Sequence, residues 1–172
     1  MQNDILDNHY NIIEPLSYNR MSEVYLVINI NDGNQYAAKV IREGNIQHEL
    51  QMATMASGLN NPNIVHLNGH GVGTLNYDGE VTNNVNYMIF EYCPNRHLFE
   101  YTHLGRFTER KAKNIFKKIL LGVQALHEAG YCHRDLKLEN ILLDQSYNPK
   151  INDFTLTTLF RQNNQQIALN SK

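Results

Sequence analysis

The chain contains 172 residues, of which 42% are hydrophobic, and its 15 Lys and Arg against 17 Asp and Glu give a net charge of -2. This size suits one domain or two small lobes with a true hydrophobic core. The charge balance gives no argument for binding nucleic acid or an anionic membrane, and no apolar run approaches the roughly 18 residues that span a bilayer, so we expect neither partner.

The cysteines and the N-terminus indicate a protein of the cytoplasm. Cys93 and Cys132 form neither a C-x-x-C motif nor a pattern of pairs, which is typical of reduced intracellular thiols. Residues 1–9 are polar and lack both the basic and the apolar region of a signal peptide. We therefore expect these residues to form a polar tail.

The first part of the chain predicts three strands and a helix. Residues 10–16, 24–30 and 35–41 are rich in β-branched and aromatic side chains, which favours strands. Residues 31–34 (NDGN) tolerate positive φ and predict a hairpin between the last two strands. Residues 45–57 have a helix-like composition.

The next part predicts an irregular segment, a buried strand and a long helix. Residues 67–86 are rich in Gly and Asn, so we expect a long, mobile excursion with short strands inside. Residues 87–92 (YMIFEY) form an almost continuous apolar run, which predicts a strand buried on both faces. Residues 108–129 predict a helix capped by Thr108 and closed by Gly130.

The spacing of apolar and basic residues predicts two different faces on that helix. The apolar stripe consists of Ala112, Ile115, Phe116, Ile119, Leu120, Val123 and Leu126. The basic residues Arg110, Lys113 and Lys117 share another face, which we interpret as solvated.

The stretch CHRDLKLENILL, residues 132–143, concentrates the groups that can do chemistry. Asp135, Lys137 and Asn140 follow neither a helical nor a strand period, which indicates a loop that presents a carboxylate, an amine and an amide. A carboxylate can accept a hydroxyl proton. The amide oxygen of Asn140 and the carboxylate of Asp153 are ligands that suit Mg²⁺.

These residues resemble the protein kinase family. HRDLKLEN is similar to the catalytic loop H-R-D-L-x-x-x-N, and Lys137 in it is typical of the serine/threonine branch. Further landmarks follow in the order of the family, namely YAAK at 36–39, NPNIV at 61–65, IFEY at 89–92 and Asp153-Phe154 as the start of D-F-G.

The resemblance implies roles for the polar residues. Lys39 would contact the α- and β-phosphates of ATP and pair with a helix glutamate, which we expect to be Glu49, with Glu43 as the alternative. Asp135 would orient the substrate hydroxyl and accept its proton, and Lys137 would stabilise charge on the transferred phosphoryl group. Asn140 and Asp153 would hold Mg²⁺.

The resemblance also implies an adenine site. Its residues would be the apolar Leu16, Val24, Ala37 and Leu142, with backbone groups of Glu91 and Cys93 at the adenine edge. The apolar members are equally consistent with ordinary core, and both interpretations can hold at once.

Two buried roles are expected beside the loop. We expect His133 to be structural and to pack near Phe154. We expect Cys132 to be a small buried hydrophobe.

The chain departs from the family pattern at three places. Ser17, Asn19 and Ser22 stand where the family has the glycines of its phosphate loop, so we expect a looser grip on phosphate, with Asn19 able to adopt positive φ. Thr155 replaces the glycine of D-F-G and should stiffen that turn.

The third departure is that no A-P-E motif follows Asp153, so we expect a domain cut short after this point. The long helix would then leave an apolar flank exposed. Thr157 and Thr158 are expected to be solvent-exposed threonines rather than phosphorylation sites.

The fold that follows is α+β and two-lobed: an antiparallel N-lobe sheet with one helix, then an incomplete helical C-lobe. Residues 10–92 would form the first lobe, residues 93–160 the hinge and partial second lobe, and residues 161–172 a disordered tail.

The expected function is binding of ATP and Mg²⁺, with transfer of the γ-phosphoryl group to Ser or Thr hydroxyls of a protein substrate. The alternatives are a pseudokinase-like binding or scaffold module that acts through a protein partner, and a fragment without function. The oligomeric state is left open.

Overall fold

A computed structural model describes residues 4–103, 105, 107–162 and 165–166. The chain divides into a first unit, Met1–Leu50 with His66–Tyr92, and a second unit, Gln51–Val65 with Cys93–Lys172. The division after Tyr92 coincides with the predicted lobe boundary, whereas residues 51–65, which we expected in the first lobe, belong to the second unit. The earlier division falls inside helix α1 (Ile46–Gly58), close to the predicted helix 45–57.

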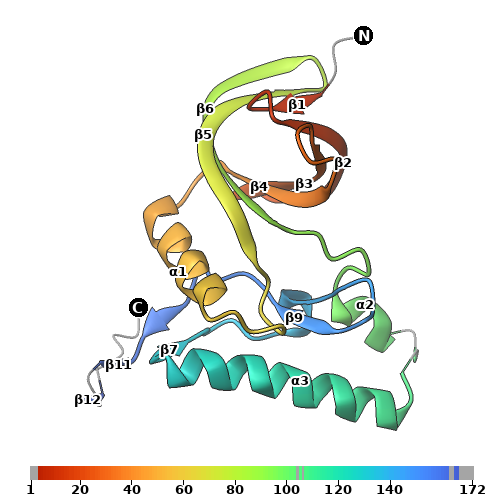
Figure 1. Cartoon of the computed structure of the whole chain (residues 1–172), viewed down its shortest axis with the longest axis vertical. Helices are drawn as coiled ribbons and strands as arrows, with labels where there is room; N and C mark the ends of the chain where they lie inside the picture. The colour runs from red at the N-terminus through yellow and green to blue at the C-terminus, as the bar shows by residue number, and fades with distance from the viewer. Residues whose placement is uncertain (1–3, 104, 106, 163–164, 167–172) are drawn as a thin grey trace. The chain divides into compact units, whose positions relative to one another are not determined.

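The first unit is a closed antiparallel barrel with the strand order β1-β2-β3-β4-β6-β5 (Figure 1). Its strands are β1 (Ile5–Leu6), β2 (Tyr10–Tyr18), β3 (Ser22–Asn29), β4 (Gln35–Ile41), β5 (Leu67–Tyr77) and β6 (Glu80–Glu91). The bounds of β4 are the predicted ones, and β2 and β3 overlap the predicted strands with shifts at their ends.

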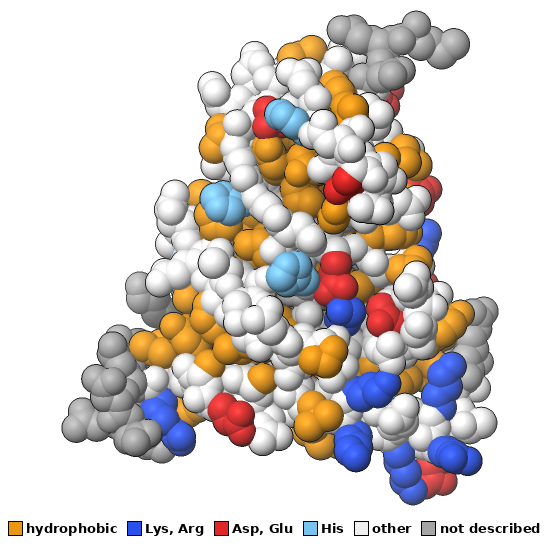
Figure 2. Space-filling model, viewed as in Figure 1, with side chains coloured by type: hydrophobic (Ala, Val, Ile, Leu, Met, Phe, Trp, Pro, Cys, Tyr) orange, Lys and Arg blue, Asp and Glu red, His pale blue; other side chains and the backbone are white. Residues whose placement is uncertain are grey.

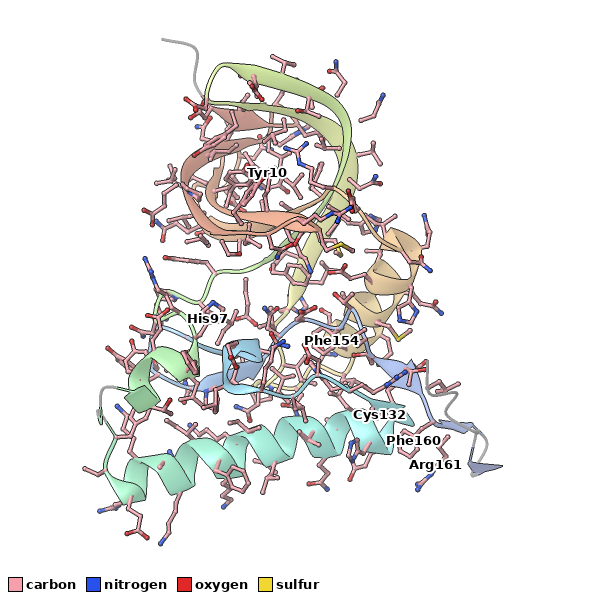
Figure 3. The ribbon with its side chains drawn as sticks, turned by 180° about the vertical axis from the view of Figure 1, so that it is seen from behind. Tyr10, His97, Cys132, Phe154, Phe160 and Arg161 are labelled. Atoms are coloured by element: carbon pink, nitrogen blue, oxygen red, sulfur yellow. The ribbon has the colours of Figure 1, made fainter. Side chains whose placement is uncertain are left out.

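Alternation along the strands gives the barrel an apolar interior and a separate outer face. Its core consists of Leu6, Tyr25, Val27, Ala38, Val40, Leu75, Val85, Tyr87 and Ile89. Tyr10 packs against this core, and Figure 3 shows its side chain within the barrel. Because successive side chains in a strand point to opposite faces, Ala37 and Lys39 of β4 lie on the outer face.

Strand β1 corrects the expectation that residues 1–9 form a polar tail. Ile5–Leu6 pairs with β2 on one side and with β5 on the other, and these pairings close the barrel. Leu6 is fully buried. A strand of two residues carries no alternating pattern, so its pairing with distant partners could not be predicted locally.

The long β5–β6 hairpin corrects the expectation of a mobile excursion over residues 67–86. Its turn lies at Asp78 and Gly79, whose φ values of 52° and 78° are those of a tight hairpin turn. This Asp-Gly pair was the signal in the sequence that could have predicted the hairpin. The expectation of a strand buried on both faces is confirmed for residues 87–90 of β6.

The second unit packs short strands against one long helix. Its elements are α2 (Leu98–His103), α3 (Glu109–Glu128), β7 (Tyr131–Cys132), a 3-10 helix η1 (Leu138–Asn140), β8 (Ile141–Leu143), β9 (Pro149–Ile151), β10 (Thr158–Leu159), β11 (Arg161–Gln162) and β12 (Gln165–Gln166). Figure 1 shows α3 running alongside β7 and β9. The approach to β9 favours glycine at 122, because a Cβ there would lie 2.8 Å from Cδ1 of Ile151 and 3.0 Å from the backbone oxygen of Asn63.

Helix α3 matches the predicted helix and is capped as expected, because the side chain of Thr108 accepts a hydrogen bond from the backbone N–H of Lys111. Of its apolar stripe, Ile115 and Leu126 are buried, whereas Phe116 and Leu120 are 61% and 50% exposed. An apolar flank is therefore exposed along this helix, as predicted.

The basic residues predicted to face solvent do so. Arg110, Lys113 and Lys117 are exposed, and Lys113 pairs with Glu109 one turn earlier in the helix. Figure 2 shows Lys and Arg side chains gathered over the N-terminal half of α3. Among the described residues, no helix combines the length and the apolar composition that a membrane span requires.

The segment after Phe154 and its partner strand β7 correct the expectations for Thr157, Thr158, Cys132 and the C-terminal tail. Thr157 is fully buried rather than exposed. Its N–H donates to the carbonyl of Phe154, and the chain then enters β10. Thr158 is partly buried and pairs with Cys132 of β7, and Cys132 is itself only partly buried. Strands β11 and β12 lie within residues 161–172, which we expected to be disordered; residues 163–164 and 167–172 are outside the described residues.

The closure of the barrel by β1 predicts a measurable cost for Leu6→Ala. Loss of a fully buried leucine should lower the free energy of unfolding by about 2–5 kcal/mol, because the removed atoms leave a cavity. Urea unfolding followed by circular dichroism measures this change. Ile13→Ala on β2, where the side chain is 51% exposed, is the matched control. Equal effects of the two substitutions would contradict the assignment of Leu6 to the core.

Candidate active site

Lys39 occupies the middle of β4 on the outer face of the barrel. It lies opposite Val24 of β3 on one side and Met88 of β6 on the other. Its neighbours along β4, Ala38 and Val40, point into the core and are fully buried. The sheet thus fixes the direction of the Lys39 side chain from both sides.

The ammonium of Lys39 forms a close ion pair with Glu49 in the first turn of α1. Both side chains are largely shielded from solvent, with exposures of 17% for Lys39 and 11% for Glu49. Glu43, the alternative partner, instead lies 3.3 Å from Arg20. A carboxylate near the N-terminus of a helix is further stabilised by the helix dipole.

The apolar residues expected around adenine in the first unit are partly exposed, not buried in the core. Leu16, Val24 and Ala37 are each of intermediate exposure. The strand register places Val24 directly opposite Lys39, and Ala37 is two residues before Lys39 on the same face. Leu16 lies at an irregularity between Pro15 and Ser17. Their role towards adenine stays a prediction.

The turn that replaces the glycine-rich loop is closed by Asn19. Its side-chain oxygen accepts hydrogen bonds from the backbone N–H groups of Met21 and Ser22, at 2.8 and 2.9 Å. Asn19 does not use the positive φ that it could adopt, and its side chain closes the turn instead. The carbonyl of Met21 also accepts from the N–H groups of Arg42 and Glu43, which ties the turn to the segment after β4.

The second unit brings together the three polar residues of the predicted catalytic loop. The ammonium of Lys137 and the side-chain amide of Asn140 both donate to Oδ2 of Asp135, each at 2.8 Å. The amide of Asn140 also donates to the backbone carbonyl of Asp135 at 2.9 Å. Because its nitrogen faces these two acceptors, the oxygen of the buried Asn140 amide is directed away from Asp135.

The charges in this loop support each other. The hydrogen bond from Lys137, and then the one from Asn140, lower the pKa of Asp135, so Asp135 is a carboxylate at neutral pH. The pKa of Lys137 is raised, first by its bond to Asp135 and further by the charges of Asp135 and Asp153. Asp153 therefore acts electrostatically on the same ammonium as Asp135.

His133 joins the catalytic loop to the segment that carries Asp153. One ring nitrogen, Nε2, lies 2.9 Å from the carbonyl of Asn152, and the other, Nδ1, accepts from the N–H of Asp135 at 3.3 Å. These bonds select the neutral tautomer with its proton on Nε2. The ring also packs edge-on against Phe154, 5.4 Å between centroids, which confirms the predicted packing of His133 near Phe154. Figure 3 labels Phe154 in the second unit.

The stiffening expected at Thr155 stays a prediction, and the structure shows how this turn is built. Asp153 carries the left-handed conformation in this turn, with φ of 64°, whereas Thr155 is not among the residues with positive φ. A β-branched side chain is therefore accommodated at 155 without backbone strain. The hydroxyl of Thr155 donates to Oδ1 of Asp153 at 2.6 Å, a contact that the sequence did not predict.

The remaining predicted residues have these places. Leu142 is partly buried in β8 opposite Lys150 of β9. Cys93 is buried, and its carbonyl accepts from the N–H of Arg96. Glu91 ends β6, its side chain accepts from the N–H of His66, and its own N–H donates to the carbonyl of His66.

The donor set in the second unit fits a hard divalent cation. Asn140 and Asp153 supply an amide oxygen and a carboxylate, the oxygen ligands that Mg²⁺ prefers when it also keeps waters and binds phosphates. The N–H of Asn152 donates to the carbonyl of Asn140, which links the two candidate ligands through the backbone.

The burial of His133 predicts a loss of stability in acid. Desolvation by burial lowers its pKa below the ordinary 6.5, so the unfolded chain takes up the proton first. Stability from this residue is complete above pH 6.5 and falls as the pH decreases below that value. Between pH 7 and 5, the urea midpoint of unfolding should fall less in His133→Gln than in wild type. The control His70→Gln, at an exposed position, should show the same fall of the urea midpoint as wild type. If the urea midpoints of wild type and His133→Gln fall equally with pH, the buried His133 is not the source of the loss of stability in acid.

The shielded ion pair in the first unit predicts non-additive substitutions. Lys39→Met should lower the free energy of unfolding by about 3 kcal/mol, because Glu49 is left buried with its charge. The double substitution Lys39→Met with Glu49→Met should recover most of that loss. A double-mutant cycle from urea unfolding tests this, and additive losses would show that the pair is not coupled.

Comparison with known proteins extends over most of this chain. The family model described as the protein kinase domain matches residues 10–171. The chain is 31% identical over 166 residues to CBL-interacting serine/threonine-protein kinase 18 of Arabidopsis thaliana, covering 93% of this chain and 30% of the relative. It is 32% identical over 171 residues to CBL-interacting serine/threonine-protein kinase 13 of the same plant, covering 96% of this chain and 32% of the relative.

A yeast relative gives a similar result over a shorter range. The probable serine/threonine-protein kinase KCC4 of Saccharomyces cerevisiae is 37% identical over 130 residues, covering 75% of this chain and 11% of the relative. The chain thus spans about a third or less of the length of these relatives. The match over residues 10–171, together with the arrangement of Asp135, Lys137 and Asn140, shows that the chain belongs to the protein kinase family.

Proposed function

We propose that this chain binds ATP with Mg²⁺ and transfers the γ-phosphoryl group to Ser or Thr hydroxyls of protein substrates. The observation that carries the proposal is the convergence of Lys137 and Asn140 on one oxygen of Asp135. This arrangement holds a hydroxyl-accepting carboxylate beside an ammonium, which suits the positioning and charge stabilisation on which phosphoryl transfer depends. The names of the relatives, which are serine/threonine kinases, favour the same substrate class.

In the proposed reaction, Asp135 accepts a hydrogen bond from the substrate hydroxyl and directs its oxygen at the γ-phosphorus. The new P–O bond forms as the bond to ADP breaks, and the hydroxyl proton passes to the Asp135 carboxylate. The lowered pKa of Asp135 keeps it an acceptor and suits orientation of the hydroxyl more than early removal of its proton. Lys137 would stabilise the charge on the transferred group.

The other proposed roles are divided between the units. Lys39, held by Glu49, would bind the α- and β-phosphates, and Leu16, Val24 and Ala37 would contact adenine. From the second unit, Leu142 and backbone groups at Cys93 would contribute to adenine binding, as would Glu91 of the first unit. Asn140 and Asp153 would hold Mg²⁺, which when bound would neutralise charge on the phosphates.

One observation favours a second candidate, a nucleotide-binding or scaffold module that transfers no phosphoryl group. Asn19 occupies the backbone N–H groups of Met21 and Ser22, the kind of donors that a phosphate loop offers to ATP. With fewer backbone N–H groups available in this turn, the phosphates of ATP would be bound more weakly. Nucleotide binding would then depend on Lys39.

Substitution of Asp135 tests transfer directly. Asp135→Asn should reduce transfer of radiolabelled γ-phosphate to a Ser/Thr peptide library by roughly 100- to 10,000-fold while ATP binding is retained. Glu139→Gln, an exposed acid in the same loop, is the matched control and should transfer at the wild-type rate. ATP binding by wild type without any transfer would reject the kinase proposal in favour of the binding module.

A further inference from the structure

Thr155 places two donors on one oxygen of the Asp153 carboxylate. Its hydroxyl lies 2.6 Å from Oδ1 of Asp153, and its backbone N–H lies 3.3 Å from the same atom. The chain turns back on itself over these residues, because the N–H of Thr157 donates to the carbonyl of Phe154 at 3.0 Å. The side chain of Asp153 is thus held by a residue two positions later.

The surroundings of this turn hold the two residues in place. Phe154, which lies between them in sequence, is 2% exposed and packs against the ring of His133. Asp153 adopts φ of 64°, a conformation that aspartate tolerates better than most residues. Thr155 is itself exposed, so its hydroxyl is ordered by its bond to Asp153 and not by burial.

We propose that Thr155 is a positioning residue for the metal, whose hydroxyl fixes the orientation of the Asp153 carboxylate towards Mg²⁺. This inference rests on the proposed function, which assigns Asp153 to the metal. A hydrogen bond to one oxygen limits rotation of the carboxylate about its last torsion and leaves less freedom to be lost on binding. Partners of this kind typically change metal affinity by about 10- to 100-fold when they are removed.

Two substitutions separate the effect of the Thr155 hydroxyl on metal binding from the effect of its methyl group. Valine keeps the branched shape and removes the donor, whereas serine keeps the donor and removes the methyl group. The backbone N–H remains in both variants. A role in positioning therefore predicts weaker metal binding for Thr155→Val and unchanged metal binding for Thr155→Ser, although each substitution alters one group on Cβ.

The experiment measures Mn²⁺ binding by electron paramagnetic resonance on the full chain in the presence of ADP, which cannot donate a γ-phosphoryl group. Thr155→Val should weaken Mn²⁺ binding by about 10- to 100-fold, and Thr155→Ala, which also lacks the hydroxyl, should match it. Thr155→Ser should bind Mn²⁺ as wild type does. Affinity for ADP without metal should be the same in all four proteins, and circular dichroism checks that each is folded.

The outcomes separate this inference from the proposed function. If wild type binds Mn²⁺ with ADP and Thr155→Val binds it equally well or better, the role of Thr155 is rejected and the proposed function stands. If Thr155→Ser is as weak as Thr155→Val, the methyl group and not the hydroxyl matters, and the inference is again rejected. If wild type binds neither ADP nor Mn²⁺, the proposed function fails and the inference fails with it.

Discussion

The second unit depends on the neutral ring of His133, which bonds to the carbonyl of Asn152 and to the N–H of Asp135. These two bonds join the loop that carries Asp135 to the segment that carries Asp153, although the two aspartates are far apart in sequence. A second link, from the N–H of Asn152 to the carbonyl of Asn140, runs beside the first. The charged groups can therefore stay partly solvated while neutral and backbone groups hold them in place, which avoids the cost of burying unpaired charge.

In the first unit, strand register holds a charged side chain in place without burying it unpaired. Tyr25 and Tyr87 fill the barrel interior with their rings, and their hydroxyls donate to Glu23 and Asp7. Burial, and then these hydrogen bonds, raise the pKa of both tyrosines, so both stay protonated donors. With the interior filled in this way, alternation along β4 leaves Lys39 on the outer face, where it pairs with Glu49.

Local signals in the sequence predicted local structure well and distant pairing poorly. The bounds of β4 and the caps of α3 follow from strand propensity and from Thr108, which act within a few residues. The pairing of Ile5–Leu6 with β2 and β5 depends on contacts made across the whole barrel, so a strand of two residues looked like a tail. In the site, the motif indicated which residues to examine, but the bond from Thr155 to Asp153 depends on the left-handed φ of Asp153, which no motif specifies.

Of the four polar residues that stand in place of family glycines, Asn19 and Thr155 have one physical effect in common. Asn19 and Thr155 each replace a residue without a side chain by one that hydrogen-bonds to a group two residues away. Such bonds lower the conformational freedom of both segments, so less order has to be gained when a ligand binds. They differ in what they occupy, because Asn19 takes up N–H donors that could face phosphate, whereas Thr155 supplies a donor to a carboxylate. Under the proposed function, loss of the glycines would therefore act against phosphate binding at the first turn and in favour of an ordered metal ligand at the second.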